Sequence, residues 1–364
     1  MAIFYVTKAG NDSNDGLSSG NPKLTISATI TAAESNSTGT PHTINIGAGT
    51  YEEAVVADGD SNMEDATVQG DTGDYSDVII QGSSAYQVRL GTGVTFKNIT
   101  VINNASAAGA AKYAVLSGAG ASTVYNCHLK SNNRGYYSTA AGSIIERCIV
   151  QCTYEGVSQG TWGVWWSAAN PSKIYSCLVI DWNHAQIYCY DKGDAVNVTV
   201  QTQYVKNTSL RGVYADNIWN CVAHKDSAVD SHSGIEGGTI HQNSVVWNFA
   251  DDVSSAGGTE ANNHESSAVS SNGEEFIDED NNNFRIRATS LAKAAGAYTY
   301  QTNNSTPLYD LVGRAYDTSA PSAGCYQYAW GAAGGKKLAG VDRDVINKIA
   351  GVASTTIAKR NGQG

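Results

Sequence analysis

The chain has 364 residues with 38 glycines, 20 tyrosines and 5 prolines, and 16% of its residues are charged. Glycine and small polar residues favour turns and aromatic residues favour strands, so this mixture indicates many short strands and few helices. The net charge of −11 argues against nucleic acid as a partner, because phosphate would be repelled. The sequence contains no apolar run of about 18 residues, so no membrane span is predicted.

The first 40 residues are expected to form an opening segment and a cap. They contain no long apolar stretch with a small-residue cleavage site, so we expect no secretory signal. A predicted amphipathic helix would cover the open end of a stack of strands, which otherwise exposes core and unpaired strand edges. The residues on its apolar side are Leu24, Ile26, Ile30 and Ala33.

The stretch NDSNDG at residues 11–16 begins like a calcium loop, with oxygen ligands at Asn11, Ser13 and Asp15. The twelfth position of such a loop needs an acid, and it is Pro22 here. A polar turn is therefore the preferred interpretation and calcium the alternative. No other metal or cofactor is expected.

A phrase of alternating apolar and small residues recurs between residues 94 and 248, for example STVYNCHLKSNN at 122–133, within a predicted β-helix domain at residues 41–329. The copies are 28, 21, 29, 44 and 22 residues apart, and the gap of 44 fits two units of 22. A period in the twenties with strand-like alternation predicts a β-solenoid. The central residues of the copies are Ile99, Cys127, Cys148, Cys177, Cys221 and Asn243, and the flanking apolar positions of the last copy are Ile240 and Val245.

Equivalent side chains should lie directly over one another inside such a coil, at the strand spacing of about 4.8 Å. The repeated cysteines are therefore expected to form one interior column rather than a zinc site or disulfides, since no CxxC pair is present. Asparagines five or six positions later should hydrogen-bond between coils at one corner. They are Asn104, Asn132, Asn183 and Asn248.

The opening segment, FYVTKAGNDSNDGLS…HTINIGAGTYEE at 4–53, resembles that of right-handed parallel β-helix proteins of the pectate-lyase-like superfamily. The segments at 274–297 and 323–329 are similar to the closing segments of that superfamily. The resemblance covers residues 3–329 and implies an all-β, single-stranded right-handed parallel β-helix with an N-terminal cap helix. The fold hosts lyases, hydrolases, adhesins and virus spikes, so it implies no single function.

The last residues differ in composition. Residues 330–340 read as a Gly/Ala linker, and 341–364 as a short helical tail. The tail resembles terminal segments of phage virion proteins, which implies docking onto other virion proteins; a frayed terminal helix is the alternative. The predicted docking residues are Val345, Ile349, Val352 and Ile357.

Carboxylates outside the predicted core are candidate catalytic groups. Two carboxylates on adjacent coils would lie about 5 Å apart, and two carboxylates separated by two coils about 10 Å apart. These distances suit the acid pairs of glycosidases. We favour Asp181, Asp226 and Asp230, with His184 and His232 nearby for proton transfer. The alternative is that these acids are ordinary solvated surface groups.

Motifs of superfamily enzymes are absent: the chain has no GHG followed by RIK, as in polygalacturonases, and no RxPxxR, as in pectate lyases. A lyase also needs a base, for which Lys192, Lys206 and Arg211 are the candidates. Enzymatic activity is therefore the second interpretation.

Aromatic residues gather in the predicted insertions between coils. Exposed tryptophan and tyrosine rings can stack on sugars, which predicts a carbohydrate-binding patch. The alternative is packing of the loops or of a subunit interface, where such residues are also enriched. The residues are Tyr154, Trp162, Trp165, Trp166 and Trp182.

Together these features favour a structural protein of the phage virion, either a head decoration or fibre or a tail-associated spike. It is expected at the particle surface as a trimer that contacts a host glycan, without nucleic acid or membrane partners. The alternatives are a polysaccharide depolymerase, acting as hydrolase or lyase, and a secreted bacterial adhesin.

Overall fold

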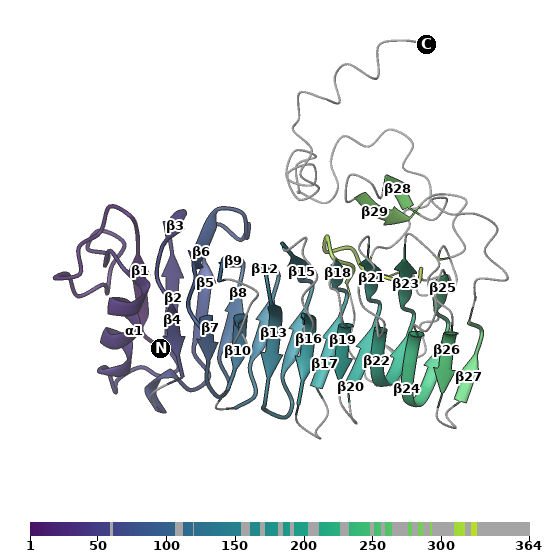
Figure 1. Cartoon of the computed structure of the whole chain (residues 1–364). Coiled ribbons are helices and arrows are strands. Elements are labelled where there is room, and N and C mark those ends of the chain that lie inside the picture. The colour runs from purple at the N-terminus through teal and green to yellow at the C-terminus, as the bar shows by residue number, and fades with distance from the viewer. Residues whose placement is uncertain are drawn as a thin grey trace, which may run out of the picture.

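The strands wind into one elongated coil that starts beside a single helix at the N-terminal end, as Figure 1 shows. This confirms the predicted all-β solenoid. The computed structural model describes residues 1–58, 61–105, 112–118, 120–153, 161–167, 172–180, 185–189, 193–202, 211–225, 233–247, 251–255, 259–263, 276–278, 283–286, 292, 309–316 and 322–325.

Each turn of the coil contributes strands to three parallel sheets, of which the first two are continuous through the long strands β22 and β24. The first sheet contains β4 (Val55–Ala57), β7 (Tyr86–Leu90), β10 (Tyr113–Ser117), β13 (Arg134–Ser138), β16 (Trp162–Trp166), β19 (Ala185–Cys189), β22 (Arg211–Trp219), β24 (Ser233–Gln242) and β26 (Asp251–Ser255). The second contains β1 (Ile3–Val6), β2 (Thr43–Ile46), β5 (Thr67–Gly70), β8 (Thr95–Lys97), β11 (Thr123–Tyr125), β14 (Ile144–Glu146), β17 (Ser172–Tyr175), β20 (Gly193–Val196), the C-terminal halves of β22 and β24, and β27 (Thr259–Ala261).

The third sheet contains β3 (Gly49–Tyr51), β6 (Val78–Gly82), β9 (Thr100–Asn103), β12 (His128–Ser131), β15 (Ile149–Cys152), β18 (Leu178–Ile180), β21 (Thr199–Thr202), β23 (Val222–Lys225) and β25 (Val245–Trp247). A short 3₁₀ turn, η1 (Ser61–Met63), lies near the N-terminal end. Outside the coil, β28 (Phe276–Asp278) and β29 (Asn283–Ile286) pair antiparallel.

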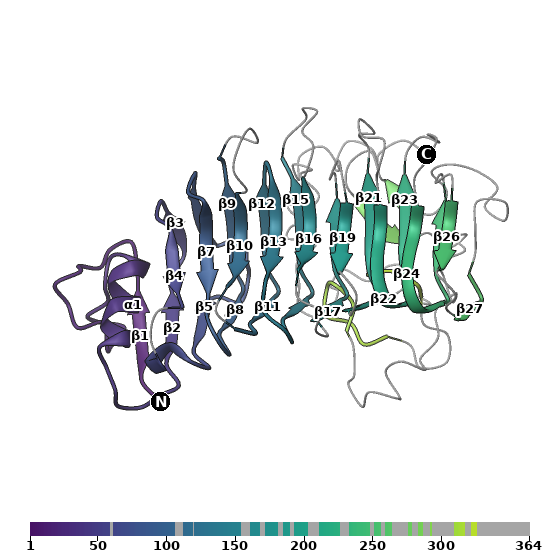
Figure 2. The ribbon, with the colours of Figure 1, turned by 60° about the horizontal axis from the view of Figure 1, so that its bottom comes forward.

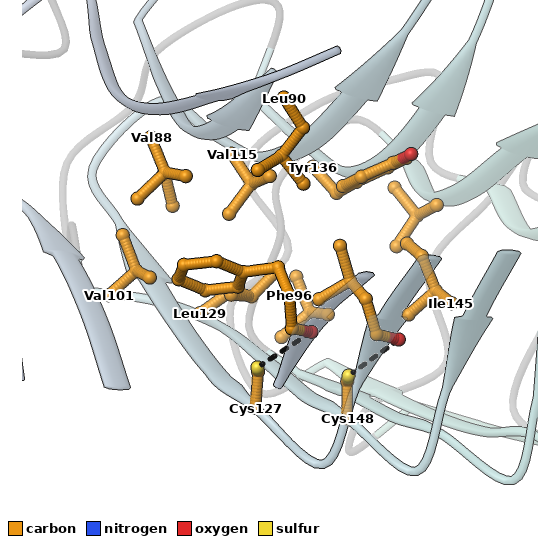
Figure 3. Packing of buried hydrophobic residues seen from close by; sticks show 14 of the residues in the cluster. Val88, Leu90, Phe96, Val101, Val115, Cys127, Leu129, Tyr136, Ile145 and Cys148 are labelled. Atoms are coloured by element: carbon orange, nitrogen blue, oxygen red, sulfur yellow. Dashed lines mark hydrogen bonds between the residues drawn. The ribbon is translucent and has the colours of Figure 1, made fainter. Parts of the chain in front are cut away.

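The cysteines form the predicted interior column. Cys127, Cys148, Cys177 and Cys221 are all fully buried free thiols. Each thiol donates to a backbone carbonyl of the preceding coil, for example Cys127 to Phe96 O at 3.8 Å and Cys148 to Val124 O at 3.5 Å (Figure 3). The unmarked coil in the 44-residue gap supplies Val198, which is also fully buried. The columns therefore stack as the repeat predicts.

The last repeat is aligned wrongly by one residue in the sequence prediction. Strand pairing places His241, not Ile240, beside Ile218, and Val246, not Val245, beside Ala223. The cysteine column therefore continues at Ser244 rather than at Asn243. The register is set by the turn before this column, where the backbone needs a left-handed residue, and that residue is Asn243 with φ of 56°.

An asparagine ladder occupies this turn, one residue before the cysteine column. The amides bond from coil to coil, with Asn126 Nδ2 donating to Asn98 Oδ1 at 2.9 Å and Asn220 Nδ2 to Asn197 Oδ1 at 3.1 Å. The sequence prediction instead places such a ladder five or six residues after the cysteine column. Of those positions Asn183 and Asn248 lie outside the described residues, whereas Asn132 does link coils, donating to Ala105 O and accepting from Thr153.

Asn220→Ala is expected to lower the free energy of unfolding by about 2 to 5 kcal/mol. It removes a buried hydrogen bond, which costs about 1 to 3 kcal/mol, and it forces alanine into a left-handed conformation, which costs about 1 to 2 kcal/mol. Asn220→Gly also removes the hydrogen bond, but glycine adopts the left-handed conformation without strain. It should therefore lower the free energy of unfolding less than Asn220→Ala does. Urea denaturation measures both variants; equal losses would contradict a role for the backbone conformation.

Helix α1 (Ile26–Glu34) covers the end of the coil, as predicted. Thr25 caps it, and the Glu53 carboxylate accepts from the backbone N–H groups of Ile26 and Ser27 at 2.9 Å each. The prediction for Leu24 is wrong, because this residue precedes the cap and Thr29 takes its place on the buried side. In the part of the chain that the structure describes, no helix has the length and apolarity to cross a bilayer.

The described part of the C-terminal region packs back onto the coil. Leu311 and Cys325 join a buried cluster on the outer side of the third sheet with Leu178 and Val222. Cys325 N donates to Thr199 Oγ1 at 3.0 Å. The domain boundaries at 40, 329 and 340 stay predictions, and the linker, the tail and the docking residues Val345, Ile349, Val352 and Ile357 lie outside the described residues.

Covering the third sheet buries two histidines, and this makes stability depend on pH. Burial lowers the pKa of His128 to about 3, helped by the nearby Lys130 ammonium, and burial lowers the pKa of His224 to about 3. Between pH about 6.5 and 3 the unfolded chain therefore binds more protons than the folded one. The contribution of these two neutral histidines to the stability of the folded state is complete above pH about 6.5 and is lost as the pH falls through this window.

We expect the free energy of unfolding to fall by about 1.4 kcal/mol per pH unit for each of these histidines below pH about 6.5. Denaturation curves at pH 7.5 and 5.0 measure the slope. In the double variant His128→Gln/His224→Gln the fall between these pH values should be smaller. An unchanged slope would show that other groups cause it.

Candidate functional site

Of the three sheets, the first is partly accessible on its outer face, as the second also is along β8, β11 and β14. Buried residues of the C-terminal region cover parts of the other two, with Tyr316 against Tyr175 and Trp219 on the second sheet and Leu311 on the third. The outward side chains of the first sheet are partly exposed along β7, β10, β13, β16 and β22. Figure 2 shows these strands side by side on one face.

A second repeated phrase explains this face. Several strands of the first sheet read outward, small, inward, outward, inward, as in YAVLS, RGYYS and WGVWW, whereas β7 (YQVRL) and β19 (AQIYC) have glutamine at the second position. Register pairs equivalent positions, such as Tyr113 with Arg134 and Tyr137 with Trp165. Outward side chains therefore form two columns. The first runs Tyr86, Tyr113, Arg134, Trp162, Ala185, Arg211 and Ser233, and the second Arg89, Leu116, Tyr137, Trp165, Tyr188, Tyr214 and Glu236.

The aromatic members of these columns stack into a continuous aromatic ladder, made of Tyr113, Tyr137, Trp162, Trp165, Tyr188 and Tyr214. Successive ring centroids are 4.6 to 5.0 Å apart. The ladder crosses five strands, a length of about 19 Å at the usual strand spacing. Because most of these rings face one another, the surface that they present to solvent consists largely of ring edges and tyrosine hydroxyls.

Two arginines lie among the rings. The guanidinium carbon of Arg134 lies 4.5 Å from the Trp165 ring centre and 5.3 Å from that of Tyr113, and its Nη1 donates to the Tyr113 hydroxyl at 2.9 Å. Arg211 lies 5.1 Å from the Tyr214 ring and is paired with Glu236 at 2.8 Å. Burial raises the pKa of Tyr113 although Arg134 opposes this, so the phenol is neutral at neutral pH.

The predicted carbohydrate-binding residues divide into three groups. Trp162 and Trp165 are part of the ladder, on strand β16 rather than in the insertion where the sequence prediction placed them. The prediction for Trp166 is wrong: its side chain is 1% exposed and points into the coil, where it contacts Tyr136. Tyr154 and Trp182 lie outside the described residues.

The favoured catalytic acids, Asp181, Asp226 and Asp230, lie outside the described residues, as do His184 and His232. Along the chain they fall between β18 and β19 and between β23 and β24, in connections that lead from the third sheet to the first. On the described strands of the first sheet, the Glu236 carboxylate binds Arg211, and the Asp216 carboxylate on β22 accepts a hydrogen bond from the Thr239 hydroxyl at 2.7 Å. Arg211 is therefore part of an ion pair on the ladder face.

The oxygen atoms of the predicted calcium loop accept hydrogen bonds from other groups of this chain. The Lys23 ammonium, on a residue only 8% exposed, donates to the carbonyls of Asp12 and Asn14 at 2.9 and 2.6 Å. Asn11 and Asp15 accept backbone N–H groups within the loop. This arrangement agrees with the polar-turn interpretation, because a lysine charge already satisfies the loop carbonyls.

Comparison with solved structures finds enzymes with parallel β-helices. Pectate lyase Pel9A is 14% identical over 90% of this chain and 96% of its own, with a TM-score of 0.51. Pectin methylesterase PemA from Erwinia chrysanthemi is 12% identical over 74% and 91% (TM-score 0.42), and a GH136 lacto-N-biosidase from Eubacterium ramulus 12% over 72% and 68% (TM-score 0.37).

No family model and no curated protein matches the chain. Identities this low carry over the fold but not the activity. The three parallel sheets and the likeness to Pel9A agree on that fold. The chain is a right-handed parallel β-helix.

Proposed function

We propose that the protein binds a linear polysaccharide along the aromatic ladder. The observation that carries this proposal is the run of partly exposed, mutually stacked rings across five strands of the first sheet. Exposed aromatic surface of this extent marks a binding site, because leaving it in water is unfavourable. An open and elongated site suits a chain molecule, whereas small ligands favour concave pockets.

The chemistry of the ladder favours a glycan over other polymers. Ring edges offer apolar contact and tyrosine hydroxyls offer hydrogen bonds, which matches the mixed CH and OH surface of a sugar. The net charge of −11 opposes nucleic acid. Pectate lyase Pel9A, named for its action on a polysaccharide, is similar in fold, which agrees with a glycan ligand.

We propose that the protein lies at the surface of a phage particle, as a trimeric head decoration, fibre or tail spike. The tail at residues 341–364 would dock onto other virion proteins. Deleting residues 341–364 should then abolish incorporation into particles while glycan binding by the purified protein stays unchanged. Normal incorporation of the truncated protein would contradict the docking role.

The second candidate function is that of a polysaccharide depolymerase, and the glycan-directed site favours it over a purely structural role. The order of the chain supports it, because Asp181 precedes the ladder strand β19, and Asp226 and Asp230 precede β24, which pairs with the ladder strand β22. Affinity electrophoresis against acidic and neutral polysaccharides, followed by assays for reducing ends and unsaturated products, tests both functions. Binding without products identifies a binding protein, products identify a depolymerase, and absence of binding contradicts the proposal.

A further inference from the structure

Arg134 lies in a position unlike that of the other arginines of the first sheet. Three rings surround its guanidinium, with centroids at 4.5 Å (Trp165), 5.3 Å (Tyr113) and 5.9 Å (Tyr137). Its Nε is buried without a hydrogen-bond partner, and one Nη1–H donates to the Tyr113 hydroxyl. The other three N–H groups belong to a side chain that is partly exposed.

The two neighbouring arginines on the same face are neutralised by carboxylates. Arg89 pairs with Asp58, and Arg211 pairs with Glu236 at 2.8 Å. Within the residues that the structure describes, Arg134 has no such ion pair. Among the described residues of this chain, which has eleven more acids than bases, the Arg134 guanidinium thus lies on the ladder without an acidic partner.

The surroundings of Arg134 favour an anion. Rings around the guanidinium displace water, so a charge that approaches it is screened less than at an open surface. The edges of aromatic rings carry the positive end of their quadrupole, which adds to the attraction. A guanidinium binds the planar oxygens of a carboxylate through paired hydrogen bonds, and it binds sulfate and phosphate oxygens similarly.

We propose that Arg134 is the subsite for an acidic group on the polysaccharide, so that the ligand is an anionic glycan that carries a carboxylate or sulfate. This inference rests on the proposed function and adds the ligand class. The acidic unit lies at β13, near the N-terminal end of the ladder, and uncharged units extend along the rings towards β22. Arg211 does not form a second subsite of this kind, because Glu236 already neutralises it.

The test compares each acidic polysaccharide with its uncharged counterpart. The probes are alginate, hyaluronan and polygalacturonate, each beside its carboxyl-reduced form, and dextran sulfate beside dextran. The wild-type protein should prefer at least one charged member of a pair, and the pair that responds tells carboxylate from sulfate. Arg134→Gln should lower the affinity for that member about tenfold and change the affinity for its uncharged counterpart much less.

Two further variants keep the test specific. Arg134→Lys retains the charge but not the paired hydrogen bonds, so it should restore part of the preference. Arg211→Gln is the matched control on the same face and should change the preference less than Arg134→Gln does. Thermal unfolding of each variant shows that the ladder strands remain folded.

The outcomes separate this inference from the proposed function. Binding of neutral glycans without preference for charge, or an acid preference that Arg134→Gln leaves intact, overturns the inference and leaves glycan binding in place. Absence of binding to every probe contradicts both. A tenfold loss confined to the charged member supports both.

Discussion

Trp166→Ala is expected to lower the free energy of unfolding by about 3 to 5 kcal/mol, the usual cost of removing a large buried side chain. Trp166 is among the largest fully buried side chains of the described coil. It fills the inward position of β16, between Ser138 and Cys189 on the neighbouring strands, and its ring lies 5.8 Å from that of Tyr136. Removing it leaves a cavity that rigid neighbouring coils cannot close.

Urea denaturation followed by circular dichroism measures this loss. Trp166→Phe is the control, because it keeps most of the aromatic volume and should cost clearly less than the alanine variant. Glycan affinity of the folded Trp166→Phe protein should equal that of the wild type. A stability loss below about 1 kcal/mol for Trp166→Ala would contradict an interior position.

Trp165→Ala is expected to lower polysaccharide affinity about 10- to 100-fold, as loss of a central aromatic residue does at other interfaces. Trp165 is the centre of the aromatic ladder: its ring lies 4.6 Å from Tyr137 and 5.0 Å from Trp162, and it faces Arg134. Its side chain points outward, so the change removes ligand contacts rather than core. Stability should fall much less than in Trp166→Ala.

Isothermal titration calorimetry with the tightest-binding polysaccharide measures the affinity of this variant. Leu116→Ala is a matched control, since Leu116 occupies the same outward column one coil before Tyr137 but is not aromatic. It should change affinity less than Trp165→Ala does. If the two variants bind equally well, the stacked rings are not the binding surface.

The coil could be predicted from sequence because most of its interior positions hold apolar or small residues that recur with each coil. The buried cysteines and Val198 follow this rule without exception. The sequence prediction misaligns the last copy because His241 occupies an interior position that apolar residues hold in the other copies. Ile240, the residue before it, fits the apolar pattern of the repeat better. The left-handed Asn243 would have fixed the register, but φ cannot be read from residue type alone.

The aromatic ladder was only partly predictable, because its outward positions share no residue type. Tyrosine, arginine, tryptophan and leucine all occupy them, so the signal lies in the small and apolar residues between, as in RGYYS and WGVWW. Assigning Trp165 outward and Trp166 inward requires the strand register. The significance of Arg134 depends on rings from three strands and on acids that pair elsewhere, which spacing along the chain does not show.

Hydroxyl-radical footprinting with and without saturating polysaccharide tests the ladder as the binding surface most directly, because it reports side chains one by one. Bound glycan should protect Tyr113, Tyr137, Trp162 and Trp165 from oxidation. Buried Trp166 should stay unreactive in both states. Ladder rings that remain equally reactive while the polysaccharide is bound would place the binding surface elsewhere and contradict the assignment.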